Sequence, residues 1–276
     1  MNVFKTKRTK QACCKNTARF RFYGDLNFFL PEHRKQKIFD WHFNGSPAVR
    51  NVIEGIGVPH TEPDLILANG QSVGFDCRLS HGDFVSVYPV FESLDISPLQ
   101  KLRHLPSDSP GFIPGFIMDV HLGKAARIMR LLGFDVLYRN DYDDPEIVRI
   151  AAAENRVVLT RDRRLLFAKA VRYAYLLRSQ NPETQVHEIL DRFDLHDHIT
   201  AFARCTSCNG QLEHAHKKDI LAHLEPKTRK YYNSFVRCRD CGKIYWEGSH
   251  FSQLKSFVSR YRKCCSNMQM VKTCPK

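Results

Sequence analysis

The chain has 276 residues, a formal net charge of +13 and a pI of about 9.3, with the composition of an ordinary globular protein. This length allows two or three small domains. No apolar run approaches the roughly 20 residues that span a bilayer, and no apolar segment of the kind found in secretory signals follows the basic N-terminus. We therefore expect a cytoplasmic protein without a membrane partner, whose ten cysteines are metal ligands or free thiols rather than disulfides.

The positive charge favours nucleic acid as a partner, because Lys and Arg bind phosphates and release counterions. The alternative is that the charge only keeps the protein in solution. Cations gather at both ends, which predicts a basic arm at residues 1–17 and a basic tail at residues 253–276. The cations concerned are Lys5, Lys7, Arg8, Lys10, Lys15, Lys255, Arg260, Arg262 and Lys263.

Residues 18–95 predict a small α/β domain. Residues 18–23 alternate apolar and charged side chains, as a half-buried strand does, and residues 39–43 resemble a second strand. Ser46 is the predicted cap of a helix that has Pro47 in its first position and ends at Gly55 or Gly57. Two further strands follow, at residues 63–67 before an Asn-Gly turn and at residues 84–89 after a Gly-Asp turn.

This order resembles the ubiquitin-like sulfur carriers of the molybdopterin and thiamin pathways. The resemblance rests on Leu67-Ala68-Asn69-Gly70 and on Gly82-Asp83-Phe84-Val85-Ser86-Val87-Tyr88-Pro89, and it implies a β-grasp fold. Those carriers end in a Gly-Gly tail that is adenylated and thiolated, whereas this chain continues through Pro89-Val90-Phe91. We therefore expect an interaction or RNA-docking module rather than sulfur transfer.

After a linker at residues 96–114, residues 115–200 show an alternation of strands and helices. Such alternation predicts a parallel sheet with helices on both faces. The predicted strands are residues 116–118, 136–138, 157–159 and 173–177. The predicted helices are residues 121–132, a helix capped by Asp144 with Pro145 in its first position, and residues 182–193.

Three aspartates occupy related positions in this pattern. Asp119 and Asp162 follow two of the strands, and Asp144 begins the helix between them, so all three should meet at the edge where parallel strands end. Each alone could be a helix cap, but three ionised carboxylates together are costly without a cation. Mg or Mn takes oxygen ligands and supports displacement at phosphorus.

We therefore predict a catalytic Mg or Mn bound by Asp119, Asp144 and Asp162, with Asp143 and Glu146 as weaker candidate ligands. Four cations are candidate contacts for substrate phosphates, or else ordinary solvated charges: Lys124, Arg127, Arg130 and Arg161.

The same residues carry a family resemblance. The segment from Asp119-Val120-His121-Leu122-Gly123-Lys124 to Leu132-Gly133 is similar to the opening signature of the PIN-like ribonucleases of the Mut-seven C-terminal type. Asp144-Pro145-Glu146-Ile147 and Leu159-Thr160-Arg161-Asp162-Arg163-Arg164-Leu165-Leu166 match the other two blocks. The resemblance implies a metal-dependent ribonuclease with Asp119, Asp144 and Asp162 at its acidic centre. Many PIN nucleases have a fourth acid shortly after the third, where this chain has Arg163 and Arg164.

Residues 201–252 predict a zinc ribbon. Two C-x2-C pairs, Cys205 with Cys208 and Cys238 with Cys241, are separated by 29 residues, and two such pairs complete a tetrahedral site for structural Zn. Three histidines between the pairs could compete as ligands, although we expect them in a helical insert: His214, His216 and His223. No partner pattern accompanies Cys264, Cys265 and Cys274. Tyr245 and Trp246 could stack on bases beside Arg237, Arg239 and Lys243, or pack against the ribbon.

The sequence thus predicts an α/β, PIN-like parallel sheet flanked by helices, preceded by a ubiquitin-like β-grasp domain and followed by a four-cysteine zinc ribbon. Two functions remain open on the residues. One is a ribonuclease that hydrolyses single-stranded or structured RNA. The other is a non-catalytic adaptor that binds RNA, tRNA or the ribosome and has a vestigial acidic site.

Overall fold

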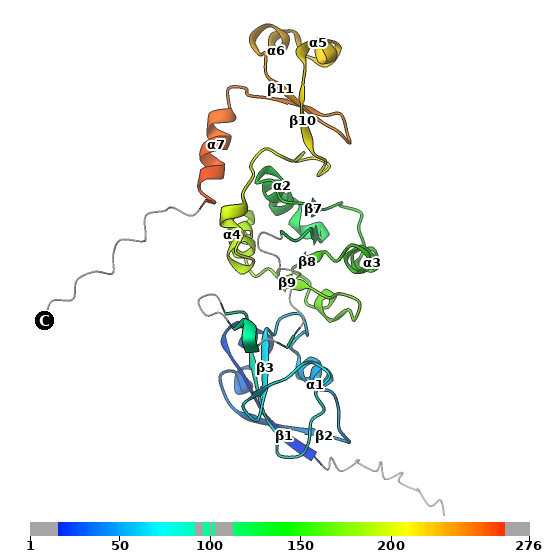
Figure 1. Ribbon diagram of the computed structural model, residues 1–276, viewed down its shortest axis with the longest axis vertical. Coiled ribbons are helices and arrows are strands. Elements are labelled where there is room, and N and C mark those ends of the chain that lie inside the picture. Colours follow the sequence, from blue (N-terminus) through cyan, green and yellow to red (C-terminus); the bar gives the residue numbers. More distant parts are fainter. Residues whose placement is uncertain (1–15, 92–95, 100, 103–112, 263–276) are drawn as a thin grey trace, which may run out of the picture. The chain divides into compact units, whose positions relative to one another are not determined.

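The computed structural model describes residues 16–91, 96–99, 101–102 and 113–262, which fall into two compact units, Met1–His104 and Leu105–Lys276 (Figure 1). Most of the predicted basic arm, part of the linker and the chain from residue 263, including Cys264, Cys265 and Cys274, lie outside the described residues. No helix in the described part is long and apolar enough to cross a membrane. The cytoplasmic location stays a prediction.

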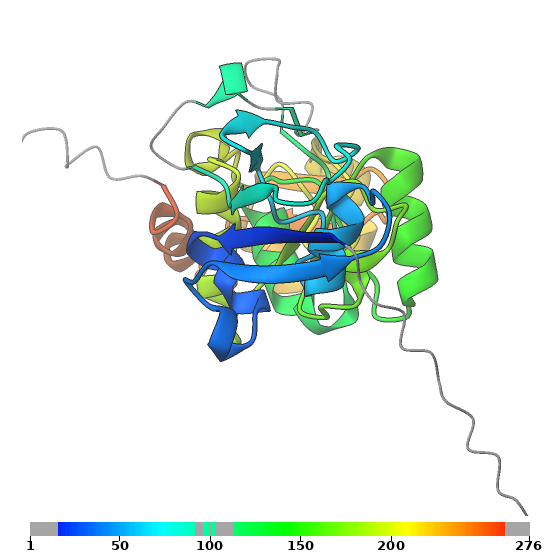
Figure 2. The ribbon, with the colours of Figure 1, turned by 90° about the horizontal axis from the view of Figure 1, so that it is seen from below.

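The first unit contains a five-stranded mixed sheet in the order β2-β1-β5-β3-β4. The strand β1 pairs parallel with β5 and antiparallel with β2, which lies beside it in Figure 2. The strands of this sheet are β1 (Asn16–Phe22), β2 (Phe39–Phe43), β3 (Leu65–Ala68), β4 (Gln71–Ser72) and β5 (Phe84–Tyr88). The helix α1 (Val49–Ile56) buries Val49, Val52 and Ile53, which confirms the predicted β-grasp arrangement.

One turn of this unit shows how local sequence sets the backbone. Asn69 and Gly70 have positive φ angles of 51° and 81°, as a type I′ turn between two hairpin strands requires. The predicted start of α1 was wrong: Ala48 is the N-cap residue, and the Ser46 hydroxyl donates to the Leu79 carbonyl instead. Three short 3₁₀ helices were not predicted: η1 (Gly24–Phe29), η2 (Glu32–Arg34) and η3 (Ser97–Leu99).

The second unit contains a parallel four-stranded sheet in the order β7-β6-β8-β9. Each strand lies within one or two residues of its predicted position: β6 (Phe116–Met118), β7 (Val136–Leu137), β8 (Val157–Thr160) and β9 (Ala174–Leu176). The helices around it are η4 (Val120–Leu122), α2 (Gly123–Leu131), α3 (Asp144–Glu154), η5 (Leu165–Phe167), α4 (Pro182–Arg192) and η6 (His196–His198).

Helices cover both faces of this sheet, as predicted. Phe116 and Met118 share a core with buried residues of α2 and α4, while the helix α3 contacts β6 and β8 outside that core. Gly133, at φ +101°, ends α2 where a Cβ atom would lie 2.2 Å from the Thr200 carbonyl oxygen, so the chain after the helix packs tightly only with glycine there.

A three-stranded antiparallel ribbon in the order β10-β11-β12 follows the sheet. Its elements are β10 (Leu212–Ala215), α5 (Lys217–Ile220), η7 (Leu221–His223), α6 (Pro226–Tyr231), β11 (Phe235–Cys238) and β12 (Ile244–Trp246). The insert contains three short helices, but the expectation that the three histidines lie in them holds only for His223: His214 lies on β10, and His216 is the N-cap residue of α5. The last helix, α7 (Phe251–Ser259), and the residues after it place Val258 and Tyr261 in the core of the parallel sheet.

Candidate functional site

The carboxylate of Asp119 lies directly after β6 and is held by three donors. Only 5 % of the residue is exposed. Its Oδ1 accepts the His121 amide at 2.8 Å, and its Oδ2 accepts the Arg161 amide at 3.0 Å and the Thr160 hydroxyl at 2.5 Å. A buried carboxylate needs such partners, and together they fix its orientation at the edge where the strands end.

Thr160 connects the ends of β6 and β8. This buried residue donates to Asp119, and its hydroxyl oxygen also accepts the Asp162 amide at 2.8 Å. One side chain therefore positions both aspartates. No role was predicted for Thr160, although a hydroxyl at the end of an apolar strand, two residues before an aspartate, was a signal for it.

The predicted cap of α3 was wrong by one residue. Asp143 is the N-cap, and its Oδ1 accepts the Glu146 amide at 2.9 Å. Asp144 is the first residue of the helix and is exposed. Glu146 forms two bonds with Arg149, at 2.8 and 2.9 Å, which hold the pKa of Glu146 below its usual value. Of these three acids, Asp144 is therefore the one whose carboxylate neither caps the helix nor forms this ion pair.

Asp162 faces a cation of its own chain. The Arg164 guanidinium bonds to its carboxylate, with Nη2 3.0 Å from Oδ2, and the Arg164 amide donates to Oδ1 at 2.8 Å. These bonds, with smaller contributions from the charges of Arg164 and His121, lower the pKa of Asp162. Asp144 adds to the field that raises the pKa of Arg164, after the larger effect of Asp162.

The three aspartates lie along one edge but their oxygen atoms do not converge. Within the described residues, the only group of three or more His, Cys, Asp or Glu whose ligand atoms all lie within 4.8 Å of one another consists of cysteines. Hard cations such as Mg are coordinated by carboxylate oxygens, so aspartate side chains are suitable ligands for such an ion. Binding one ion with all three aspartates would require their oxygen atoms to move closer together than they lie in this structure, in competition with the ion pair between Asp162 and Arg164.

Three of the four predicted phosphate contacts are exposed and one is not. Lys124 and Arg127 are exposed on α2, and Arg161 is exposed beside the acids. Arg130 is only 2 % exposed. Its guanidinium donates to the carbonyl oxygens of Val136, Ser207 and Tyr138, at 2.9, 2.9 and 3.3 Å. These bonds occupy it in the interior, so the structure does not support Arg130 as a phosphate contact, and we leave it out of the proposed ones.

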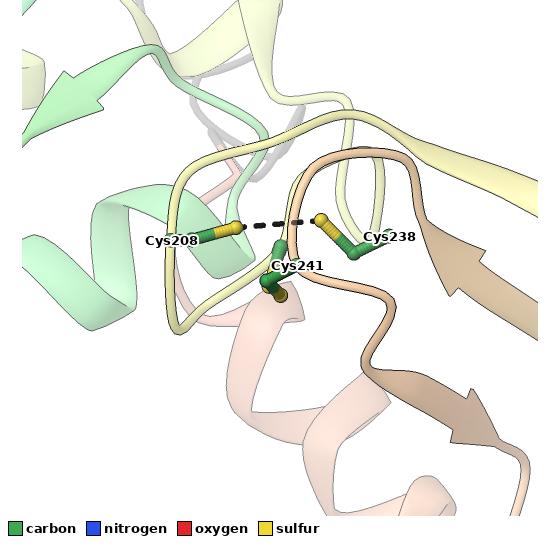
Figure 3. A group of neighbouring side chains, drawn as sticks. Cys208, Cys238 and Cys241 are labelled. Carbon is green, nitrogen blue, oxygen red and sulfur yellow. Dashed lines mark hydrogen bonds between the residues drawn. The ribbon is translucent and has the colours of Figure 1, made fainter.

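The four cysteines of the two C-x2-C pairs form one cluster. Their sulfur atoms all lie within 4.8 Å of one another. The sulfur atoms of Cys208, in the first cysteine loop, and Cys238, at the end of β11, are 3.3 Å apart and point at each other in Figure 3. The remaining pair, Cys205 and Cys241, is 3.7 Å apart. Such a set of thiols could hold a metal ion and is compatible with a zinc ribbon.

The thiols of this cluster have divergent proton affinities. Burial alone would raise the pKa of Cys205, but the Tyr245 hydroxyl at 3.0 Å and amides of the same loop lower it to about 6. Burial and the neighbouring thiols raise the pKa of Cys208 to about 12. Thiolates this close repel one another, so a cation in the cluster would favour the fully deprotonated set.

The first cysteine loop is bonded to the edge strand β7. The Asn209 side chain accepts the Val136 amide at 2.9 Å and donates to Asp135 at 2.8 Å, while Arg130 donates to the Val136 carbonyl. Asn209 is 7 % exposed and has a φ of +77°, a conformation that asparagine adopts more readily than most residues. The ribbon and the parallel sheet therefore share a hydrogen-bonded interior.

The predicted base-stacking residues of the ribbon have separate roles. Tyr245 bonds to Cys205 and so packs against the cysteine cluster. Arg237 and Arg239 both pair with Glu213, at 3.3 and 2.9 Å. Trp246 remains 40 % exposed. His214 and His216 lie near each other, outside the cysteine group.

A parallel sheet with aspartates along its carboxyl edge, preceded by a β-grasp unit and followed by a four-cysteine ribbon, defines a PIN-like nuclease fold with two accessory modules. Family models agree with this class: the Mut7-C RNAse domain matches residues 114–258, and the Mut7-C ubiquitin domain matches residues 15–95. The chain belongs to the Mut7-C RNAse family. No curated protein and no solved structure matched the chain.

Proposed function

We propose that the protein is a metal-dependent ribonuclease that hydrolyses RNA phosphodiester bonds with Asp119, Asp144 and Asp162. The observation that supports this most directly is the bonding of Thr160, which fixes Asp119 and the chain at Asp162 on one edge, where Asp144 is left free by the cap at Asp143. A catalytic site needs several carboxylates held in preset orientations. A helix cap, by contrast, needs only one carboxylate.

The aspartates would hold Mg or Mn, and such an ion would acidify water and neutralise charge on the phosphate. Each carboxylate oxygen offers two acceptor positions, and Oδ1 of Asp119 accepts one bond from the residues that the structure describes. This oxygen therefore has a lone pair for an ion. Lys124, Arg127 and Arg161 would hold neighbouring phosphates. The four cysteines would bind a structural Zn that supports the sheet through Asn209 and Arg130.

The alternative function, a non-catalytic adaptor for RNA, tRNA or the ribosome, is favoured by one contact. The Arg164 guanidinium already neutralises Asp162, and the three carboxylates do not converge within 4.8 Å. A vestigial site, in which an arginine neutralises an aspartate in place of the metal ion, would have these two features.

The test separates the two functions by cleavage. Zinc-loaded protein is incubated with labelled single-stranded and structured RNA, with Mn or Mg added or left out. Chelators are avoided because they would also remove zinc from the thiolates. The double variant Asp119→Asn/Asp162→Asn is compared with Asp141→Asn, whose carboxylate lies on the same loop as Asp144 but pairs with Arg139.

We expect cleavage that depends on the added metal, is lost in the double variant and persists in Asp141→Asn. Absence of cleavage in the unsubstituted protein, with RNA binding unchanged in both variants, would instead establish the adaptor.

A further inference from the structure

The excess positive charge of the described chain is confined to its last part. Residues 16–91 contain seven Lys and Arg against eight Asp and Glu, and residues 113–200 contain thirteen of each. Residues 201–262 contain twelve against five. The ribbon and its insert, residues 201–252, contain nine of these cations against five acids, and the insert alone, residues 216–234, contains five against two. The insert therefore keeps an excess of positive charge whether or not the cysteines hold zinc as a tetrathiolate with two net negative charges, whereas residues 113–200 are balanced.

Part of this charge is used inside the ribbon. Arg237 and Arg239 pair with Glu213, and Arg229 donates to the Leu221 and Leu224 carbonyls. Lys217 donates to Asn233. Lys227 and Lys230 on α6 are exposed, and neither forms an ion pair with any residue that the structure describes.

Aromatic side chains adjoin these two lysines. Tyr231, at the end of α6, is 67 % exposed, and Lys230 Nζ lies 5.4 Å from its ring centroid. Lys227 and Tyr231 are four residues apart and so share one helix face. Tyr232 is half-buried against the core of the ribbon, and its ring centroid lies 6.5 Å from that of the exposed Trp246. Trp246 belongs to the edge strand β12.

We propose that Lys227, Lys230, Tyr231, Tyr232 and Trp246 form a binding surface for single-stranded RNA, which we call the insert surface. Exposed aromatic rings stack on unpaired bases, and neighbouring cations contact the phosphates. The partner must be anionic to match the charge and must present unstacked bases to match the rings. Duplex RNA offers phosphates but no free base faces, so single strands fit both features.

This inference deepens the proposed function, on which it rests: the insert surface would hold the part of the substrate that flanks the cleaved bond. Within the second unit, α5 and α6 lie at the end of the β10–β11 ribbon away from the parallel sheet (Figure 1). An RNA strand bound there is therefore held at a distance from Asp119. The insert surface would thus contribute to the affinity for RNA and not to the cleavage step.

The test measures binding without cleavage. The full-length zinc-loaded protein, with no added Mg or Mn, is titrated into a fluorescein-labelled oligouridine of about 20 nucleotides, long enough to reach beyond one binding patch. Anisotropy is recorded at low and high salt. The charge variant Lys227→Glu/Lys230→Glu is compared with Lys169→Glu/Arg172→Glu, which changes two exposed cations just before β9, at the opposite end of the parallel strands from the acids.

We expect the insert variant to bind at least about tenfold more weakly and to lose about one to two units of salt slope, while the control changes affinity by less than about threefold. Trp246→Ala should weaken binding by about tenfold and Trp246→Phe by much less, because a phenyl ring can still stack. In a Trp41→Phe protein, whose only tryptophan is Trp246, RNA should quench the emission.

Equal losses in both charge variants, unchanged affinity in the insert variant, or no quenching of Trp246 would each overturn the insert surface. These outcomes are independent of catalysis. Cleavage with unaltered binding in the insert variant would leave the nuclease intact and remove this surface, whereas weakened binding without cleavage in any protein would retain the surface in an adaptor.

Discussion

The two neighbouring aspartates at the start of α3 have different partners, and this difference assigns their roles. Asp143 accepts the Glu146 amide and so caps the helix, while Asp144 is exposed and makes no cap bond. A cap residue contributes to helix stability, whereas Asp144 contributes only through its charge in the first turn. In our proposal Asp144 binds metal.

Exchanging each aspartate for alanine should separate stability from activity. Asp143→Ala should lower the free energy of unfolding by about 1 kcal/mol, because the first turn of α3 loses its acceptor. Asp144→Ala should leave stability nearly unchanged and abolish cleavage. Urea unfolding and the RNA cleavage assay measure the two effects. A stability loss confined to Asp144→Ala would show that the cap assignment is reversed.

Asp135 should make stability depend on pH in the acid range. Burial alone would raise its pKa, but hydrogen bonds from Arg156 and Asn209 hold the pKa below its usual value. A group with a lowered pKa stabilises the fold above its unfolded pKa of about 3.9, and this contribution is lost as the pH falls through the folded value.

We therefore expect the difference in unfolding free energy between the natural protein and Asp135→Asn to be constant near neutral pH and to shrink below about pH 4. Urea unfolding at a series of pH values measures it. A difference that does not vary with pH would mean that Asp135 acts through its shape and not through its charge.

The positions of the aspartates could be predicted from the sequence better than their hydrogen-bond partners could. Asp119, Asp144 and Asp162 could be placed on one edge because apolar strands precede two of them. The bonds of Thr160 to Asp119 and to the Asp162 amide had a signal in the hydroxyl at the strand end. The ion pair between Asp162 and Arg164 had none, because it depends on the rotamers of two exposed side chains. The predicted role of Arg130 assumed that helical spacing from Arg127 would keep it on the solvent side, but the last turn of α2 faces the cysteine loop.

Among the elements, β7 is the strand whose environment the sequence did not reveal. It pairs with β6 on one side, and on the other side the Val136 amide and carbonyl bond to Asn209 and Arg130. Strand positions followed from local apolar runs, so they could be predicted. The closure of β7 by a loop some 70 residues later in the chain depends on tertiary contact, which no local pattern encodes.

The variant Asn209→Gly should isolate this closure, because glycine tolerates the φ of +77° and only the side-chain bonds are lost. Leaving the buried Val136 amide unpaired should cost about 1–3 kcal/mol of unfolding free energy. Asn155→Gly is the matched control, since Asn155 also has a positive φ but is exposed at the end of α3. Equal effects of the two changes would contradict a specific role for Asn209.

For the whole molecule, the division into two units separates the β-grasp domain from everything after it. The parallel sheet, the ribbon and α7 belong to one unit, in which Val258 and Tyr261 complete the core of the sheet. The predicted boundaries near residues 200 and 252 therefore cross a continuous set of contacts. Sequence motifs, such as the cysteine pairs, identify a module by its functional residues. The hydrophobic core is set by side-chain packing, which extends across the boundaries between modules.

Removal of the proposed zinc ion should consequently destabilise the second unit and spare the first. Each unit contains one of the two tryptophans, Trp41 in β2 and Trp246 in β12. In single-tryptophan variants, a chelator should lower the unfolding temperature reported by Trp246 by several degrees or more, since structural zinc contributes folding energy. The temperature reported by Trp41 should stay constant. A parallel decrease at both tryptophans would mean that the units unfold together.

The closed edge of β7 has one more consequence. A parallel strand whose outer amides and carbonyls are uncovered is a template on which another chain can add a strand. Here the first cysteine loop covers the Val136 amide through Asn209, while Arg130 of α2 covers the Val136 carbonyl and is bonded to the same loop. Loss of the proposed zinc ion would release the loop and uncover the outer edge of β7, so the protein would not only unfold in part but would also associate with its own copies into aggregates. In this proposal the supply of zinc governs the solubility of the protein as well as its folding.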